Sequence, residues 1–298
     1  MAIDTFSVLD LPPELIVHLL KNYTYERLND LLTTCKTINK LIEDNRNSLA
    51  SKDIYHIDLE RRRVRAWRDF SWCDRIPFRS FEYISKFFCN VNVKVLTVNK
   101  LDEEICEFLI EKANKKMLRF EQLRLFHSFS VSHSSVQRLL KAGRCTGINF
   151  EAVESNMKPS DLSLEGYQSM DAMCFEMDDS IDGPFFESVL EVSKATKFIF
   201  HACDKIPQAF VRSLFQKWLN GSRKIDSVRI TTNQNFSFDE IIEDLKIQKV
   251  DNSTWKMKNA VGDNATITMR RNNFHFFVAF EVNEHRVEDI LYKIPFIE

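Results

Sequence analysis

Histidine and cysteine are the residue types of this chain that could hold a metal ion, or act as a nucleophile and its base. The closest approach to a metal-ligand pair is His201-x-Cys203, and no partner pair stands at the spacing of a zinc site. His127, His133 and His201 would be the candidates for a small hydrolase or transferase in an α/β domain. That interpretation requires polar groups converging at strand ends, whereas the sequence has no nucleophile elbow, phosphate loop or His-Glu-x-x-His motif. We therefore expect no enzyme: no catalytic residues, no metal and no cofactor.

The cysteines are odd in number, scattered singly and set mostly among apolar residues. This distribution is typical of reduced thiols in a protein core. They are Cys35, Cys73, Cys89, Cys106, Cys145, Cys174 and Cys203.

Composition and charge indicate a soluble folded protein of 298 residues, with 44% hydrophobic and 28% charged residues. The formal net charge is -2 with acids and bases interspersed, so we expect neither nucleic acid nor a membrane as a partner. No stretch approaches the roughly 20 apolar residues that cross a bilayer, and the N-terminus lacks the pattern of a signal peptide. We expect a cytoplasmic or nuclear location.

The elements that would position functional groups begin with short amphipathic helices near the N-terminus. Pro12 or Pro13 fits the first turn of a helix over residues 13–21, and Asp10 could cap that helix. Thr24 is a candidate cap for a second helix, and Thr37 opens a third. Three helices this short cannot bury all of their leucines against one another. Part of their apolar surface must therefore pack against another part of the chain or a partner.

The run Leu11-Pro12-Pro13-Glu14-Leu15-Ile16, the leucine-rich second helix and Cys35-Lys36 at its end resemble an F-box. Ile38 stands near the place where the family usually has a tryptophan. The resemblance implies a three-helix F-box over residues 1–46 that binds a Skp1-type adaptor and, through it, a cullin. The residues that it implies for the adaptor contact are Leu11, Pro12, Leu15, Ile16, Leu19, Leu28, Leu31, Leu32 and Cys35.

Residues 47–90 are predicted to form a helical connector. Its basic run over residues 61–68 could be a nuclear-import or nucleic-acid patch, but a solvated helix face is favoured because acidic residues flank it. A further helical stretch over residues 81–88 leads into the next domain.

Residues 91–298 alternate between short β-rich runs and amphipathic helical patterns at intervals of about 25 to 30 residues. The predicted strands span residues 93–98, 122–126, 147–150, 172–176, 196–200 and 226–230. The predicted helices span residues 102–115, 134–141, 185–194, 208–219 and 238–245. A closed or doubly wound α/β domain and an open leucine-rich-repeat-like solenoid are both possible, and the interval favours the solenoid.

The C-terminal third has a second resemblance. Helix residues 210–219, including Lys217-Trp218, then Gly221 and a strand at Val228, are similar to nematode-type F-box-associated domains. A polar turn at residues 262–264 between apolar runs predicts the short β-hairpin that commonly follows in those domains.

The fold class is thus expected to be α+β overall, with an N-terminal F-box, then an α/β repeat domain that ends in a hairpin. The resemblances imply the substrate-recruiting subunit of an Skp1-cullin-F-box ubiquitin ligase, which holds an unidentified target protein on its repeats. The alternative is a repeat-domain scaffold without a ligase role, whose N-terminal helices only cap the solenoid. The two differ in whether the leucine face of the helices is exposed in the free protein.

Most phenylalanines are expected in the core, among them Phe198, Phe200, Phe210, Phe215, Phe276 and Phe280. Phe126, His127 and Phe129 follow a predicted strand and are better candidates for an exposed recognition edge. Lys100, Arg124 and Arg229 could receive a phosphate, but isolated basic residues are common on protein surfaces.

Overall fold

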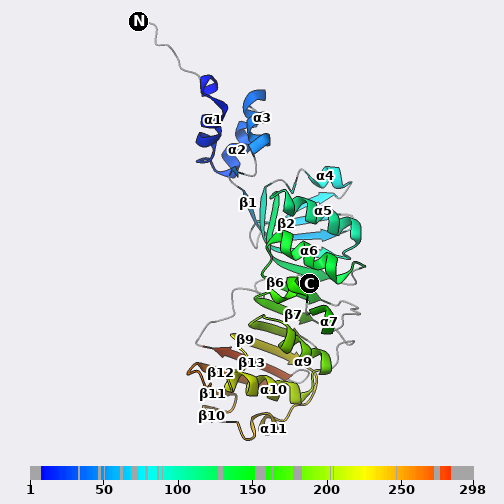
Figure 1. Cartoon of the computed structure of the whole chain (residues 1–298), viewed down its shortest axis with the longest axis vertical. Coiled ribbons are helices and arrows are strands. Elements are labelled where there is room, and N and C mark those ends of the chain that lie inside the picture. Colours follow the sequence, from blue (N-terminus) through cyan, green and yellow to red (C-terminus); the bar gives the residue numbers. More distant parts are fainter. Residues whose placement is uncertain are drawn as a thin grey trace.

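The computed structural model describes residues 8–282, except 33, 46–47, 50, 61–62, 69–72, 78–79, 86, 89, 127–129, 152–158, 163, 177–182, 202, 204, 246 and 272–275. A group of short helices lies at one end of an elongated α/β body (Figure 1). The elements of this group are η1 (Val8–Asp10), α1 (Pro13–Leu20), α2 (Tyr25–Leu31) and α3 (Lys36–Asn45). The predicted helices at the N-terminus are therefore confirmed.

Local sequence explains where these helices begin. Pro13 occupies the first turn of α1, and Pro12, not Asp10, stands at its N-cap without a side-chain bond. The backbone N–H of Arg27 donates to Thr24 Oγ1 at 3.5 Å, as expected of a cap for α2. At α3 the N–H of Ile38 donates to Cys35 Sγ at 3.4 Å, so the cap is Cys35.

The body is built on a 13-stranded sheet in the order β10-β11-β12-β13-β9-β8-β7-β6-β5-β4-β1-β2-β3. The strands are β1 (Lys52–Glu60), β2 (Arg63–Trp67), β3 (Cys73–Pro77), β4 (Val91–Asn99), β5 (Leu118–Phe126), β6 (Gly147–Glu151), β7 (Ala172–Glu176), β8 (Lys197–His201), β9 (Ser227–Thr232), β10 (Ile247–Lys249), β11 (Thr254–Lys258), β12 (Asn264–Arg271) and β13 (Phe276–Val282). The helices are α4 (Phe81–Ser85), α5 (Glu103–Asn114), α6 (His133–Gly143), α7 (Pro159–Leu162), α8 (Glu165–Gln168), α9 (Gly183–Val192), α10 (Gln208–Leu219) and α11 (Phe238–Ile242).

Strands β1 and β4 to β9 are parallel and alternate with helices, whereas antiparallel strands extend both edges of the sheet. Each strand from β4 to β9 is added beside the preceding one, and successive helices contact one another, as α5 does α6. The helices therefore form one row along one face of the sheet, as Figure 1 shows. The alternation predicted for residues 91–230 and the C-terminal hairpin are confirmed.

The main core fills the space between this helix row and the sheet. Alternate strand residues point into it, for example Leu96, Leu123 and Ile148 in one row across the sheet. The six phenylalanines assigned to the core are buried there. Cys106, Cys145, Cys174 and Cys203 are buried and Cys35 is half-buried, and none of these five cysteines forms a disulfide.

The prediction of a helical connector over residues 47–90 is wrong. This segment forms β1, β2 and β3 with the short helix α4, and β1 pairs in parallel with β4. In β2 the basic run alternates with the buried side chains of Val64 and Ala66, which is the period of a strand. The α/β body therefore begins near Lys52 rather than at residue 91.

No helix that the structure describes has both the length and the apolar character needed to span a membrane.

Candidate functional site

An exposed apolar surface lies at the N-terminal end of the molecule. Leu15 and Leu19 stand four residues apart on one face of α1, with 51% and 43% of their surface exposed. The surface also contains exposed side chains from η1 and from the turn after α1. We call the following residues the N-terminal apolar surface: Val8, Leu9, Leu15, Leu19 and Tyr23. They are five of the nine large hydrophobic side chains found exposed among the described residues, so exposed apolar area is concentrated here.

The helices beneath this surface have a small core of their own. It consists of Ile16, Leu20, Leu28, Ile38, Ile42 and Leu49, and it is separate from the main core of the α/β body. The helices are joined to the body near Asn90, whose Nδ2 donates to the carbonyl of Leu49 at 3.1 Å. The small core is thus completed within the helical group, and the N-terminal apolar surface remains exposed to solvent.

The structure divides the residues implied for the adaptor contact into three sets. Pro12, Leu15 and Leu19 are exposed. Ile16 and Leu28 are buried, with 3% and 4% of their surface exposed, and serve as core in this conformation. The half-buried remainder packs around that core: Leu11, Leu31, Leu32 and Cys35. Sequence analysis did not single out Val8, Leu9 or Tyr23; their apolar character beside the Leu-Pro-Pro run was the available signal.

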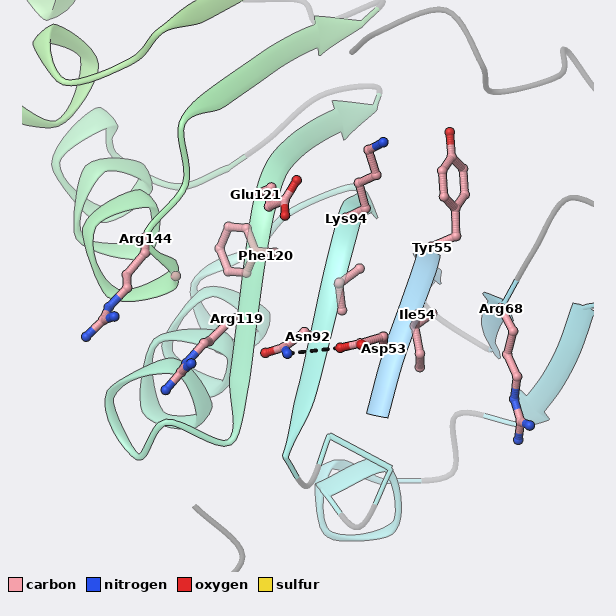
Figure 2. Close-up of a pocket in the computed structure, with 12 residues that line it drawn as sticks. Asp53, Ile54, Tyr55, Arg68, Asn92, Lys94, Arg119, Phe120, Glu121 and Arg144 are labelled. Carbon is pink, nitrogen blue, oxygen red and sulfur yellow. Dashed lines mark hydrogen bonds between the residues drawn. The ribbon is translucent and has the colours of Figure 1, made fainter. Parts of the chain in front are cut away.

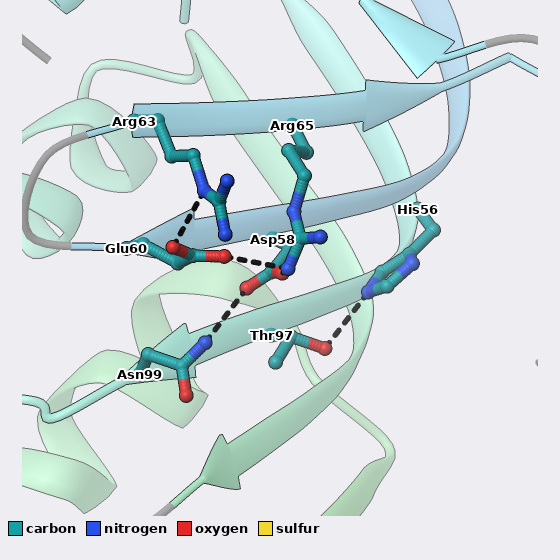
Figure 3. A network of polar contacts seen from close by, with 7 residues as sticks. All are labelled: His56, Asp58, Glu60, Arg63, Arg65, Thr97 and Asn99. Carbon is teal, nitrogen blue, oxygen red and sulfur yellow. Dashed lines mark hydrogen bonds and ion pairs between the residues drawn. The ribbon is translucent and has the colours of Figure 1, made fainter. Parts of the chain in front are cut away.

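A second candidate site is the face of the sheet opposite the helix row, which we call the polar face. Its carboxylates Asp58, Glu151 and Glu176 are buried, with 5%, 8% and 7% of their surface exposed. Figure 3 shows its charged network on β1, β2 and β4. The guanidinium of Arg65 lies 2.5 Å from carboxylate oxygens of both Asp58 and Glu60. Asn99 Nδ2 donates to Asp58 Oδ1 at 3.1 Å, and Arg63 Nε donates to Glu60 at 2.7 Å. These groups are cross-strand neighbours, since Asp58 pairs with Arg65 and Glu60 with Arg63.

His56 lies beside this network. Its ring stacks on Trp67 with centroids 4.6 Å apart, and its Nε2 lies 2.8 Å from Thr97 Oγ1. Burial, and then the charges of Arg124 and Arg65, lower the pKa of His56 from 6.5 to about 4. The ring is therefore neutral at pH 7.

The polar face continues along the parallel strands. Arg124 on β5 forms an ion pair with Glu151 on β6, and its guanidinium lies 3.6 Å from Glu176 on β7. His201 Nε2 on β8 lies 3.9 Å from the other carboxylate oxygen of Glu176. Burial raises the pKa of Glu176, although the charge of Arg124 acts in the opposite direction. Further along, Arg229 pairs with Glu281 at 3.4 Å.

These contacts occupy some of the side chains that the sequence offered as candidates for binding phosphate or a partner. Arg124 and Arg229, considered as phosphate receptors, already bind carboxylates of the same chain. Phe126 is half-buried, whereas His127 and Phe129 lie outside the described residues. His133 Nδ1 lies 3.1 Å from the Tyr167 hydroxyl. Within the part of the chain that the structure describes, no three histidine, cysteine or acidic side chains are grouped as metal ligands would be.

Comparison of the sequence with models of protein families and with curated proteins gave no match in either case. The functional argument therefore depends on the residues and their arrangement.

Proposed function

We propose that this chain is the substrate-recruiting subunit of an Skp1-cullin-F-box ubiquitin ligase. The observation that carries the proposal is the N-terminal apolar surface, which stays exposed on a helical group with its own small core. Exposed apolar patches on soluble proteins mark sites of protein–protein interaction. The order of elements agrees with an F-box whose exposed helix face binds a Skp1-type adaptor, and through it a cullin.

The α/β body would hold the target protein. Its parallel strands follow one another in a single direction from β4 to β9, which favours an open, leucine-rich-repeat-like arrangement over a doubly wound domain. The mechanism would be proximity: the body fixes how far a bound target lies from the ubiquitin-charged enzyme. The chain itself would make and break no covalent bond.

The alternative is a scaffold whose N-terminal helices only cap the sheet. A cap would bury its leucines against the sheet core, whereas Leu15 and Leu19 are exposed and the two cores are separate. These observations favour the adaptor-binding interpretation.

The test is co-purification of the full chain with a Skp1-type adaptor, followed by titration. Leu15→Asp together with Leu19→Asp should abolish the complex without unfolding the protein, because both side chains are exposed. At roughly 2 kcal/mol for each residue at the centre of an interface, the loss would be about 1,000-fold in affinity.

The matched control is Val250→Asp with Val261→Asp, which places the same charges on exposed apolar positions of the α/β body. The control should bind as the wild type does. Failure of the wild type to bind the adaptor at micromolar concentrations would refute the proposal and favour the scaffold.

A further inference from the structure

A groove between the C-terminal parts of α5 and α6 is lined almost entirely by cations and small apolar side chains. It has a volume of about 390 Å³. Its apolar floor contains Ile110, Ala113 and Ala142. Its basic residues are Lys116, Arg119, Arg138, Lys141 and Arg144, and no acidic residue is present among the described residues that line it. The chain as a whole carries a net charge of only -2, so this concentration of positive charge is local.

The backbone holds two of these cations at positions that usually belong to glycine. Lys116 and Arg144 follow α5 and α6, and each has a φ of 59°. A left-handed residue after a helix is commonly glycine, because a side chain there costs about 1 to 2 kcal/mol. Cations near a helix C-terminus do interact favourably with the helix dipole. Arg119 lies on a strand, however, so the dipole does not explain its place in the groove.

Close packing brings Arg144 beside Arg119. Gly143 lies against the ring of Phe120, and a Cβ at this glycine would come 2.2 Å from ring carbons. The end of α6 can therefore approach β5 closely. Figure 2 shows Arg119 and Arg144 side by side and pointing in the same direction. Both also line an adjoining pocket of about 560 Å³, which includes Lys94 and the carboxylates of Asp53 and Glu121.

The charges of the groove are mostly uncompensated. Arg138 forms a bidentate pair with Glu107, at 2.7 and 3.2 Å, so one carboxylate already binds at the rim. Among the described residues, no carboxylate lies within ion-pair distance of Lys116, Arg119, Lys141 or Arg144. Four exposed cations thus remain around an apolar floor.

We propose that this groove binds an acidic segment, rich in aspartate and glutamate, of a partner protein. Carboxylates would pair with Arg119 and Arg144, as Glu107 pairs with Arg138, while an apolar residue of the segment would contact Ile110 and the alanines. The groove lies where α5 and α6 end and β5 begins. Naming the partner as the recruited target rests on the proposed function, but the binding itself requires no adaptor.

The probe is a fluorescein-labelled peptide, Glu-Glu-Leu-Glu-Glu-Leu-Glu-Glu, titrated with the full chain in fluorescence anisotropy at about 0.1 M salt. Arg119→Glu with Arg144→Glu should weaken binding at least tenfold. The matched control, Arg270→Glu with Arg271→Glu, makes the same charge change at exposed positions of β12 and should change affinity less than twofold.

A second variant separates binding from folding. Arg144→Gly should raise or preserve the thermal midpoint, because glycine adopts the left-handed conformation without cost, and should still weaken peptide binding.

Equal losses of affinity in the groove and control variants would overturn the proposal. An unchanged anisotropy of the peptide at the highest concentration of the wild-type chain would also overturn it. So would binding of the glutamine analogue with equal affinity, or binding of a phosphorylated peptide or an RNA oligonucleotide more than tenfold tighter. If the peptide does not bind but the adaptor still co-purifies, only the groove proposal is refuted. If the peptide binds and the adaptor does not, the ligase proposal is refuted and the groove proposal is supported.

Discussion

Replacing His56 with glutamine should make the protein more resistant to unfolding in mild acid. In the folded state His56 is packed against Trp67, lies 2.8 Å from Thr97 Oγ1, and is close to two arginine charges. Its folded pKa is about 4, against 6.5 for an unperturbed histidine. Between these two pH values the unfolded chain binds a proton at this residue and the folded protein does not.

The sign and size of the effect follow from proton linkage. A group whose pKa is lowered on folding destabilises the folded state as pH falls through the unfolded pKa, and the loss is complete below the folded pKa. At 1.36 kcal/mol per pKa unit, the full loss is about 3 kcal/mol by pH 4, and about 2 kcal/mol is lost by pH 5. Glutamine keeps a donor for Thr97 but takes up no proton.

The assay is urea unfolding of the wild type and of His56→Gln at pH 7 and pH 5. The free energy of unfolding of the wild type should fall by about 2 kcal/mol more than that of the variant. Raised carboxyl pKa values, as at Asp58 and Glu176, act in the opposite direction but are common to both proteins. His18→Gln, at an exposed position of α1, should behave as the wild type does. Parallel pH curves for the wild type and His56→Gln would refute the argument.

Other substitutions test the packing of the fold by chemical denaturation. Ile16→Ala should destabilise the N-terminal helices by about 2 to 5 kcal/mol, because the side chain is buried. No change would mean that the small core does not exist. Gly143→Ala should cost about 1 to 3 kcal/mol, since its Cβ would meet the Phe120 ring; unchanged stability would contradict that close approach. Arg124→Met should cost about 3 kcal/mol by leaving Glu151 without its cation, and adding Glu151→Leu should restore part of the loss; additive effects would exclude that coupling.

The alternation of strands and helices could be predicted from sequence because their apolar spacing reflects burial. The run Val95-Leu96-Thr97-Val98 and the helix at Gln208–Leu219 show this clearly, and both lie where expected. The strands of residues 47–90 could not be predicted from charge alone. The basic side chains of Arg63 and Arg65 suggested a solvated helix face. The period of two between the buried side chains of Val64 and Ala66 instead indicates a strand.

The candidate sites were less accessible from sequence for physical reasons. Leu15 and Ile16 are adjacent on one broad stripe, and both a core and a partner require apolar residues, so periodicity could not separate them. The ion pairs of the polar face join residues far apart in the chain, such as Arg124 with Glu151. The cationic groove forms from the ends of α5 and α6 with β5, and only the packing of these elements brings their charges together.

The most direct test of the central claim is hydrogen exchange on the full chain with and without a Skp1-type adaptor. The account predicts slower exchange over residues 8–23, which contain the N-terminal apolar surface, with unchanged exchange in β7, β8 and β9. Protection confined to the strands of the sheet, or a complex that leaves residues 8–23 unprotected, would contradict it.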